Sequence, residues 1–211
     1  MKFLDIHTHH QLQSGETSFF SCPMKDWPLI KGNLHYSLEI HPWHLTEENA
    51  EKQCTWLMKT FSQSGVIAIG ECGLDKLRGA SFSLQLEVFK QCATLAEQAS
   101  LPLIIHAVKC TQELIHFQKE LRPSTPWIIH GFRGRKEVAQ EYLKHGFYLS
   151  FGEYYQEEAL RIVPLDRLFL ETDESTLSIA SIYQKAAGTL EMEVDELAHQ
   201  MTNNYRRIWK K

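Results

Sequence analysis

Short apolar runs that alternate with segments of helical period are the feature that most constrains the fold of this chain. Several runs are almost continuously apolar, as expected for parallel strands with helices on one face and a packed interior on the other. The candidate strands are residues 3–7, 17–22, 35–41, 66–71, 101–106, 126–130, 147–150 and 167–172. The candidate helices are residues 46–63, 82–99, 111–121, 135–145, 154–163 and 193–208.

Strand and helix alternate, which predicts an α/β fold and favours a (β/α)8 TIM barrel over an open doubly wound sheet, although periodicity alone leaves closure open. Only nine residues separate the first two candidate strands and twelve separate the next two. Parallel strands usually need a dozen or more residues to return. We therefore expect the first one or two crossover helices to be shortened or missing, with the second strand the least secure. A length of 211 residues fits a single domain, 1–211.

Charge and cysteine content exclude several classes of protein. The formal net charge of −4 gives no global basic field of the kind that draws proteins to nucleic-acid backbones. The five cysteines are scattered without CxxC spacing, which argues against a disulfide framework or a structural zinc module. The chain has no 18-residue apolar stretch, and its first residues do not resemble a signal peptide. We expect a cytoplasmic protein with no membrane contact and no obligate protein partner.

Histidine and acidic residues recur where the candidate strands end, which is the edge that carries the active sites of barrels. Residues i and i+2 of an extended segment point the same way, so His7 and His9 can face one ion. A lone histidine at a strand end is more often structural, and the cluster is what indicates a metal site. Its members are His7, His9, His41, Glu71, His106, His130 and Asp173.

This set of side chains predicts a transition-metal site. Imidazole and carboxylate together suit Zn²⁺, Mn²⁺, Fe²⁺ or Ni²⁺ better than Ca²⁺ or Mg²⁺, although Zn, Mn, Mg, Fe and Ni are not distinguished. Two histidines and Asp173 can hold one ion, two further histidines a second, and Glu71 can bridge them. Two such ions activate water for hydrolysis. The absence of GxSxG, P-loop and GxGxxG motifs leaves nucleophilic-serine and nucleotide-cofactor chemistry without support.

A series of motifs along the chain resembles those of the TatD family of metal-dependent deoxyribonucleases, within the amidohydrolase-like barrels. The motifs are "DIHTHH" (5–10), "IHPWH" (40–44), "IGECGLD" (69–75), "Q…LA…LPLIIH" (91–106), "HGFRG" (130–134), "SFG" (150–152), "LETDES" (170–175) and "TNNYRRIW" (202–209). No single motif is specific, but their combination and order are.

The resemblance implies a TIM barrel with two metal positions. It implies that one position is held by His7, His9, Glu71 and Asp173, and the other by Glu71, His106 and His130. It further implies that Asp173 is the general base, which accepts a proton from the attacking water, and that Glu71 takes part in catalysis as the shared ligand. His41 is similar to the family histidine that faces the substrate phosphate.

Departures from the family pattern concern the substrate contacts. Val108 occupies the position where the family usually has arginine, and Lys109 follows it. Arg133 stands where the family has a small polar residue, and Arg78 follows "GLD". Either arginine could serve as a phosphate clamp or be a solvated surface charge. The trimmed stretch lies between His9 and His41 and is expected to open one side of the rim.

Three functions follow from these features. The first is a two-metal deoxyribonuclease acting on DNA or a small phosphodiester, with weak, salt-sensitive binding through Lys76, Arg78, Lys109 and Arg133. The second is an amide or ester hydrolase on the same barrel, including a D-aminoacyl-tRNA deacylase, which Val108 favours and the ligands cannot distinguish. The third is a non-catalytic metal-binding scaffold, which is disfavoured because all the ligands and Asp173 are present.

Overall fold

A computed structural model of the chain describes residues 2–10, 17–27 and 35–209. Its strands are β1 (Leu4–Thr8), β2 (Thr17–Pro23), β3 (His35–Ile40), β4 (Val66–Asp75), β5 (Leu103–Val108), β6 (Trp127–Ile129), β7 (Tyr148–Phe151) and β8 (Leu168–Leu170). Their order in the sheet is their order in the chain. The pairings β1–β2, β3–β4, β4–β5, β6–β7 and β7–β8 are parallel. Each predicted strand is confirmed, including the second.

The helices are α1 (Ala50–Thr60), α2 (Phe82–Ala99), α3 (Thr111–Leu121), α4 (Lys136–Lys144), α5 (Glu157–Arg161), α6 (Ile179–Leu190) and α7 (Val194–Trp209), with a 3₁₀ turn η2 (Leu165–Arg167). Helices α2 and α3 have the predicted bounds. Helix α1 begins four residues later than predicted, and α5 is shorter at both ends. Among the helices of the described residues, none is long and apolar enough to cross a bilayer.

The chain forms two compact units, which are described separately. The terminal unit consists of Met1–Phe20 and Ile128–Lys211, and the central unit consists of Ser21–Trp127. The chain passes between the units within β2 and again within β6. The prediction of a single domain stays a prediction.

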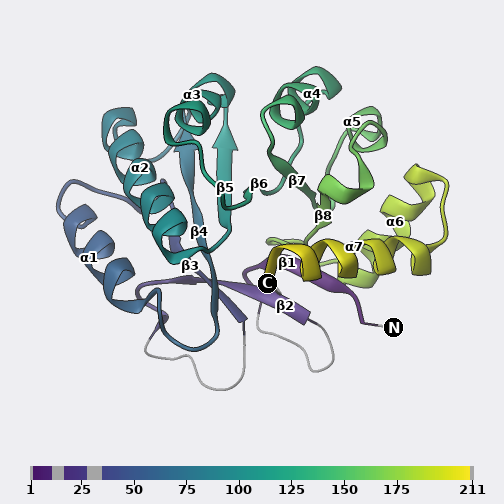
Figure 1. The fold of residues 1–211 in the computed structure, drawn as a ribbon, viewed down its shortest axis with the longest axis horizontal. Coiled ribbons are helices and arrows are strands. Elements are labelled where there is room, and N and C mark those ends of the chain that lie inside the picture. The colour runs from purple at the N-terminus through teal and green to yellow at the C-terminus, as the bar shows by residue number, and fades with distance from the viewer. Residues whose placement is uncertain (1, 11–16, 28–34, 210–211) are drawn as a thin grey trace. The chain divides into compact units, whose positions relative to one another are not determined.

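In the central unit, helices α1 to α3 lie along the same side of strands β3 to β5 (Figure 1). Helix α2 packs on β4 and is the longest helix of this unit. The side chain of Ser81 accepts a hydrogen bond from the backbone N–H of Leu84 and so caps its first turn. The helix buries an apolar stripe that includes Val88, Phe89 and Cys92, and each large side chain buried in this way contributes about 1.5–3 kcal/mol.

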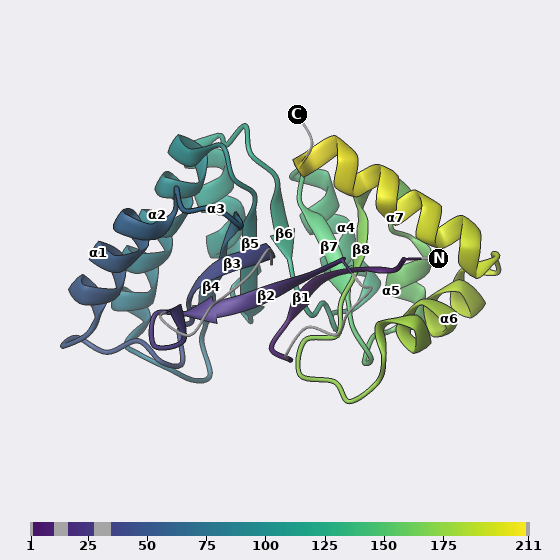
Figure 2. The ribbon, with the colours of Figure 1, turned by 90° about the horizontal axis from the view of Figure 1, so that it is seen from below.

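In the terminal unit, helices α5, α6 and α7 lie on the same side of β7 and β8 (Figure 2). Strand β8 and the residues after it lie beside β1, where Thr8 pairs with Asp173 in a parallel bridge. The buried hydroxyl of Tyr183 on α6 donates a hydrogen bond of 2.9 Å to the carbonyl oxygen of Leu4. The Thr8–Asp173 bridge joins segments from the two ends of the chain at the edge where the candidate ligands of this unit lie, and the Tyr183 bond attaches α6 to the first residue of β1.

Helix α6 is absent from the sequence prediction. Gly188 and the β-branched Ile179 and Ile182 have modest helix propensity, which weakens the local signal. The helix forms because Ser178 caps it, accepting a bond of 3.1 Å from the N–H of Ser181, and because its isoleucines are buried. Tertiary burial therefore outweighs local propensity in this segment.

Few described residues test the prediction that the first crossover helices are shortened or missing. Residues 9–10 and 24–27, which are described, contain no α-helix between β1 and β3. The rest of these two connections, residues 11–16 and 28–34, lies outside the described residues.

Candidate functional site

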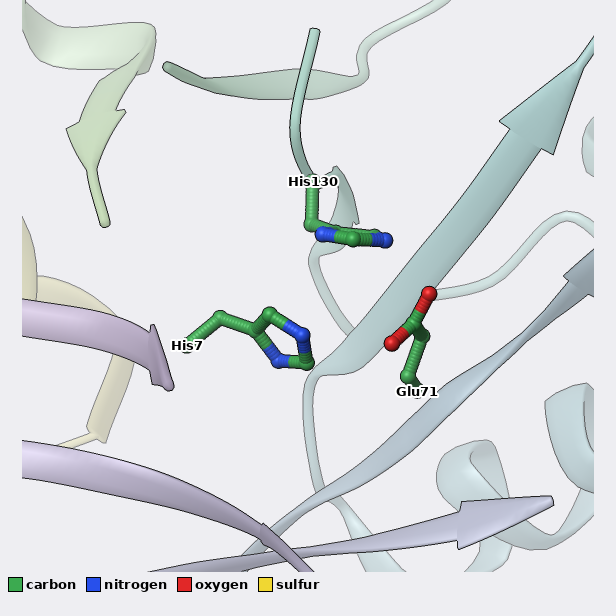
Figure 3. Close-up of side chains that lie close together, drawn as sticks. All are labelled: His7, Glu71 and His130. Atoms are coloured by element: carbon green, nitrogen blue, oxygen red, sulfur yellow. The ribbon is translucent and has the colours of Figure 1, made fainter. Parts of the chain in front are cut away.

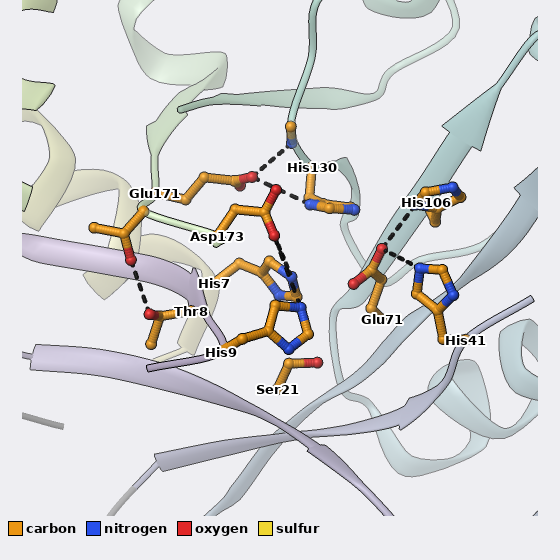
Figure 4. Close-up of polar contacts among 12 residues, drawn as sticks. His7, Thr8, His9, Ser21, His41, Glu71, His106, His130, Glu171 and Asp173 are labelled. Atoms are coloured by element: carbon orange, nitrogen blue, oxygen red, sulfur yellow. Dashed lines mark hydrogen bonds and ion pairs between the residues drawn. The ribbon is translucent and has the colours of Figure 1, made fainter. Parts of the chain in front are cut away.

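The terminal unit brings His7, His9 and Asp173 together. The Nε2 atoms of His7 and His9 lie 3.9 and 3.7 Å from Oδ1 of Asp173, and the two imidazole rings are 5.0 Å apart (Figure 4). His7 is buried, whereas the side chains of His9 and Asp173 are 29 and 21% exposed. The predicted pairing of positions i and i+2 at the end of the first strand with the acid after the last strand is thus present in the geometry of this unit.

Backbone hydrogen bonds fix Asp173 beside β1. Its N–H donates to the carbonyl oxygen of His7 at 2.9 Å, and its own carbonyl accepts from the N–H of His9 at 3.1 Å. Asp173 has φ of +54°, a left-handed conformation that aspartate tolerates better than most residues. The backbone therefore turns at this residue so that its carboxylate faces the two histidines.

A second set of hydrogen bonds joins β1 to the segment after β8, between Asp5 and Thr172. Asp5 is buried and accepts hydrogen bonds from the N–H of Thr172 at 3.0 Å and from its hydroxyl at 2.7 Å. Burial raises the pKa of Asp5 to about 7, while the bonds from Thr172 oppose the rise. Asp5 was not a predicted site residue, and its structural role is to hold the strand of His7 against the segment of Asp173.

His130 lies beside His7, with the ring centroids 4.4 Å apart (Figure 3). Its Nδ1 is 3.1 Å from Oε1 of Glu171, which also accepts a bond of 2.6 Å from the N–H of Gly131. Burial alone would raise the pKa of the fully buried Glu171, but the adjacent His130 holds it below the ordinary value. A carboxylate acceptor places the proton of a neutral imidazole on Nδ1, so Nε2 of His130 carries the lone pair that a metal ligand needs.

Glu171 is a residue of the candidate site that the sequence prediction missed. It lies inside the quoted motif "LETDES", two residues before Asp173, but no role was assigned to it. The available signal was an acid in an otherwise apolar strand end, where burial requires a partner. That partner, His130, is 41 residues away in sequence.

The central unit brings together His41, Glu71 and His106, which are all buried. Oε1 of Glu71 lies 3.0 Å from Nε2 of His41 and 2.8 Å from Nδ1 of His106 (Figure 4). Nδ1 of His41 accepts a hydrogen bond of 3.0 Å from the N–H of Trp43, so the proton of the neutral ring is on Nε2. His41, predicted to face the substrate phosphate, is therefore also a member of the Glu71 group.

A glycine precedes Glu71 where β4 passes the backbone of β5. Gly70 has φ of +119°, and a Cβ at this residue would lie 2.2 Å from the carbonyl oxygen of Ile104. Any side chain there would push the strands apart. The first glycine of the motif "IGECGLD", Gly70, is therefore required by its contact with the strand that carries His106.

Asp75 supports the other side of His106, and the sequence prediction gave it no role. Its Oδ2 accepts a hydrogen bond of 2.7 Å from Nε1 of Trp43 and lies 3.5 Å from Nε2 of His106. Burial alone would raise the pKa of Asp75, but the bonds from Trp43 and from the N–H of Leu77 hold it below the ordinary value. Asp75 is thus an ionised acceptor that orients the side chains around it.

The donor atoms present fit a divalent transition metal. In the terminal unit, ligand atoms of His7, His9 and Asp173 lie within 4.8 Å of one another, and in the central unit so do those of His41, Glu71 and His106. Each set combines imidazole nitrogen with carboxylate oxygen, the mixture that suits Zn²⁺, Mn²⁺, Fe²⁺ or Ni²⁺. The assignment of Glu71 to both metal positions, and of His130 to the second, stays a prediction.

The predicted substrate contacts differ in their surroundings. Arg133 is 61% exposed, and its Nη2 lies 3.9 Å from Oδ2 of Asp173. Arg78 is exposed and lies over the ring of Trp43. Lys109 is exposed at the end of β5, and Lys76 is paired with Glu113 at 2.5 Å. Arg133 therefore lies next to a candidate ligand, whereas Arg78 lies over Trp43, whose ring is beside His41 and His106.

Comparison with known proteins gives a consistent set of relatives. The family model described as "TatD related DNase" matches residues 27–210. The uncharacterised metal-dependent hydrolase YabD of Bacillus subtilis is 31% identical over 192 residues, which is 80% of this chain and 75% of YabD. A protein of Erwinia amylovora named 3′-5′ ssDNA/RNA exonuclease TatD is 29% identical over 197 residues, 81% of this chain and 76% of the relative.

Solved structures agree in fold. The crystal structure of YjjV, a TatD homologue from Escherichia coli, superposes with a TM-score of 0.82 at 20% identity, covering 99% of this chain and 98% of that chain. A TatD-family hydrolase from Entamoeba histolytica gives a TM-score of 0.76 at 16% identity, covering 98 and 97%. With the strand order and parallel pairings described above, this likeness confirms the predicted (β/α)8 TIM barrel.

Proposed function

Because the chain belongs to the TatD related DNase family of metal-dependent hydrolases, we propose that it hydrolyses phosphodiester bonds in single-stranded DNA. The observation that carries this proposal is the pair of histidine–carboxylate groups, one built from residues on or just after β1 and β8 and the other from residues on or just after β3, β4 and β5. Relatives from Erwinia amylovora and Pantoea ananatis, each 29% identical to this chain, are named 3′-5′ ssDNA/RNA exonucleases. Cleavage from a 3′ end is the corresponding mode for this chain.

Two divalent ions per chain are part of the proposal. His7, His9 and Asp173 would hold one ion, and Glu71 and His106 would take part in holding the other. Such ions polarise a phosphoryl oxygen and lower the pKa of water, which is the chemistry that side chains alone do not supply. The imidazole content of both groups favours a transition metal over Mg²⁺ or Ca²⁺.

The side chains of the chain divide the remaining work. The partly exposed carboxylate of Asp173 is placed to accept a proton from the attacking water. His41 carries its proton on Nε2, where it faces Oε1 of Glu71 at 3.0 Å, and a phosphate oxygen of the substrate would compete with Glu71 for that proton. Arg133 presents an exposed guanidinium beside Asp173, where it can pair with the phosphate of the substrate. Lys109 and Arg78 add positive charge at the ends of β5 and β4.

The substrate and setting follow from charge and cysteine state. With a net charge of −4, the chain lacks the basic surface of proteins that coat duplex DNA, which favours short single-stranded segments. All five cysteines are buried and none forms a disulfide, as in proteins of a reducing, cytoplasmic setting. The proposal includes neither a membrane nor a second protein as partner.

One observation favours a second candidate function. Val108 stands where the family usually carries an arginine that can contact phosphate, and it ends β5. An amide or ester substrate, including D-aminoacyl-tRNA, would not need that contact, and the same ions would activate water toward a carbonyl carbon. The two functions differ in how strongly they depend on Arg133 and in the substrates that are cleaved.

The test compares three substrates after elemental analysis of the purified protein. Single-stranded DNA, a chromogenic phosphodiester and a neutral ester are each incubated with the metal-loaded chain. Cleavage of the DNA that is lost in Asp173→Asn and retained in Asp166→Asn supports the proposal, because Asp166 is an exposed acid on the turn before β8. Turnover of the ester alone would establish the second candidate instead, and DNA cleavage by Asp173→Asn would remove Asp173 as the base.

A further inference from the structure

We infer that Trp43 and Arg78 form a stacking platform for an unpaired nucleobase of the substrate strand. The inference rests on the proposed function, and it adds a contact with a base of the strand to the contacts with its phosphates. In the central unit, the guanidinium carbon of Arg78 lies 3.9 Å from the centroid of the Trp43 ring, over its face. Both side chains are exposed, and Trp43 is 37% exposed despite its size.

Two hydrogen bonds hold Trp43 in place. Nε1 of Trp43 donates a hydrogen bond of 2.7 Å to Oδ2 of the buried Asp75. The backbone N–H of the same tryptophan donates to Nδ1 of His41 at 3.0 Å. The first bond fixes the indole and the second fixes the backbone that carries it, so a base that stacks on this ring costs little conformational freedom of the protein.

Hydrogen bonds to Asp75 also fix the backbone of the loop that carries Arg78. Oδ1 of Asp75 accepts from the backbone N–H groups of Leu77 and Arg78 at 2.7 and 3.1 Å. Gly79 has φ of +97°, and a Cβ there would lie 2.4 Å from the carbonyl oxygen of Pro42. The glycine lets the loop after β4 approach the segment that carries Trp43, which brings the guanidinium over the indole.

The platform lies next to side chains of the candidate metal group. The centroid of the Trp43 ring is 4.8 Å from that of His41 and 5.4 Å from that of His106. A nucleotide whose phosphate is bound by His41 has its own base, or that of its neighbour, within reach of the platform. The position therefore fits a base adjacent to the cleaved bond.

The chemistry of the pair selects a base over other ligands. Unpaired bases stack on tryptophan and on the planar guanidinium of arginine, and every base offers a π-face, so such sites tolerate any sequence. The charge of Arg78 also favours a polyanion. In a duplex the faces of the bases are covered by their neighbours, so the platform selects single strands or strand ends.

The test measures binding in an Asp173→Asn background, so that the strand stays intact. The full chain, loaded with Mn²⁺, is titrated into two labelled six-nucleotide strands, one of thymidines and one abasic with the same phosphates. Because stacking on an aromatic side chain is worth a few kcal/mol per base, the thymidine strand should bind at least about fivefold tighter. Trp43→Leu should abolish that preference and leave the affinity for the abasic strand unchanged, whereas Trp43→Phe should keep most of it.

The matched control is Tyr148→Leu. Tyr148 also pairs with an arginine, Arg167, whose guanidinium lies 4.7 Å from its ring, but it begins β7 at the amino ends of the strands. This variant should bind both strands like the parent. Equal loss of affinity for both strands in Trp43→Leu, or an unchanged preference, would overturn the inference.

Cleavage of the thymidine strand by the unsubstituted protein separates the two proposals. Cleavage without a preference that depends on Trp43 leaves the proposed function standing and refutes the platform. A preference that depends on Trp43 without cleavage supports the platform and refutes the proposed nuclease activity.

Discussion

Replacing Gln85 by leucine is expected to destabilise the protein by about 3 to 5 kcal/mol. Gln85 on α2 is 2% exposed, and its amide lies between β4 and the loop after it. Its Oε1 accepts from the N–H of Asp75 at 2.7 Å, and its Nε2 donates to the carbonyl oxygens of Ala80, Asp75 and Arg78 at 2.8, 3.0 and 3.2 Å. One side chain thus closes the loop that carries Arg78.

The magnitude follows from counting these bonds. Two amide hydrogens and one amide oxygen are satisfied by the protein, which is about 3 kcal/mol at about 1 kcal/mol of net stability for each of these three groups. Leucine has a similar volume, so little cavity is created, but the buried N–H of Asp75 loses its acceptor at a further cost of about 1–3 kcal/mol. Burial of the new methyl groups offsets about 1 kcal/mol of that cost.

The assay is urea unfolding followed by tryptophan fluorescence, with the thermal midpoint as a second reading. A chain of this size loses roughly 2–4 °C of midpoint per kcal/mol, so a drop on the order of 10 °C is expected. Gln98→Leu, an exposed glutamine on the same helix, is the control and should stay within about 0.5 kcal/mol. A loss below about 1 kcal/mol in Gln85→Leu would show that the hydrogen-bond count overstates the role of this side chain.

Three further results are expected. Glu97 accepts four hydrogen bonds from Ser124 and Thr125, and these hold its pKa below the ordinary 4.5 against the opposing effect of burial. Glu97→Gln should therefore lose about 1 kcal/mol of stability at pH 7. The unfolding curves of the variant and the parent should converge as the pH falls below 4.5 and through the lowered pKa of the folded state, because an acid with a depressed pKa no longer contributes to stability once it is protonated. Glu171→Gln should weaken Zn²⁺ binding about 10- to 100-fold by calorimetry, with the exposed Glu174→Gln as control, since the bond that orients His130 is impaired; equal affinities would contradict that role. Arg133→Ala should raise KM for a phosphodiester more than for a neutral ester, and equal effects in steady-state kinetics would leave Arg133 without a phosphate role.

The strands and most helices could be predicted because their signals are local. Parallel strands buried on both faces are continuous apolar runs, and β5 and β8 are of this kind. Helix α2 has a clear apolar stripe, and its predicted bounds agree with the structure to the residue. Helix α6 has a serine cap but weak propensity, and its stability comes from burial that only the folded chain reveals.

The residues of the candidate site likewise fall into those that the sequence reveals and those that it does not. Histidines and acids at strand ends, such as His7 and His106, are visible in the sequence because their position in the strand is their signal. Glu171, Asp75 and Gln85 were given no role because their function lies in partners far along the chain or in several bonds at once. Pattern and periodicity carry no information about such pairings.

The left-handed backbone at Asp173 decides which substitutions can probe its chemistry. Asparagine is nearly as comfortable as aspartate at φ of +54°, so a change to asparagine removes the negative charge and leaves the turn in place. Alanine would add conformational strain of about 1 kcal/mol or more to the loss of the acid. An inactive alanine variant would therefore mix a displaced loop with a missing proton acceptor.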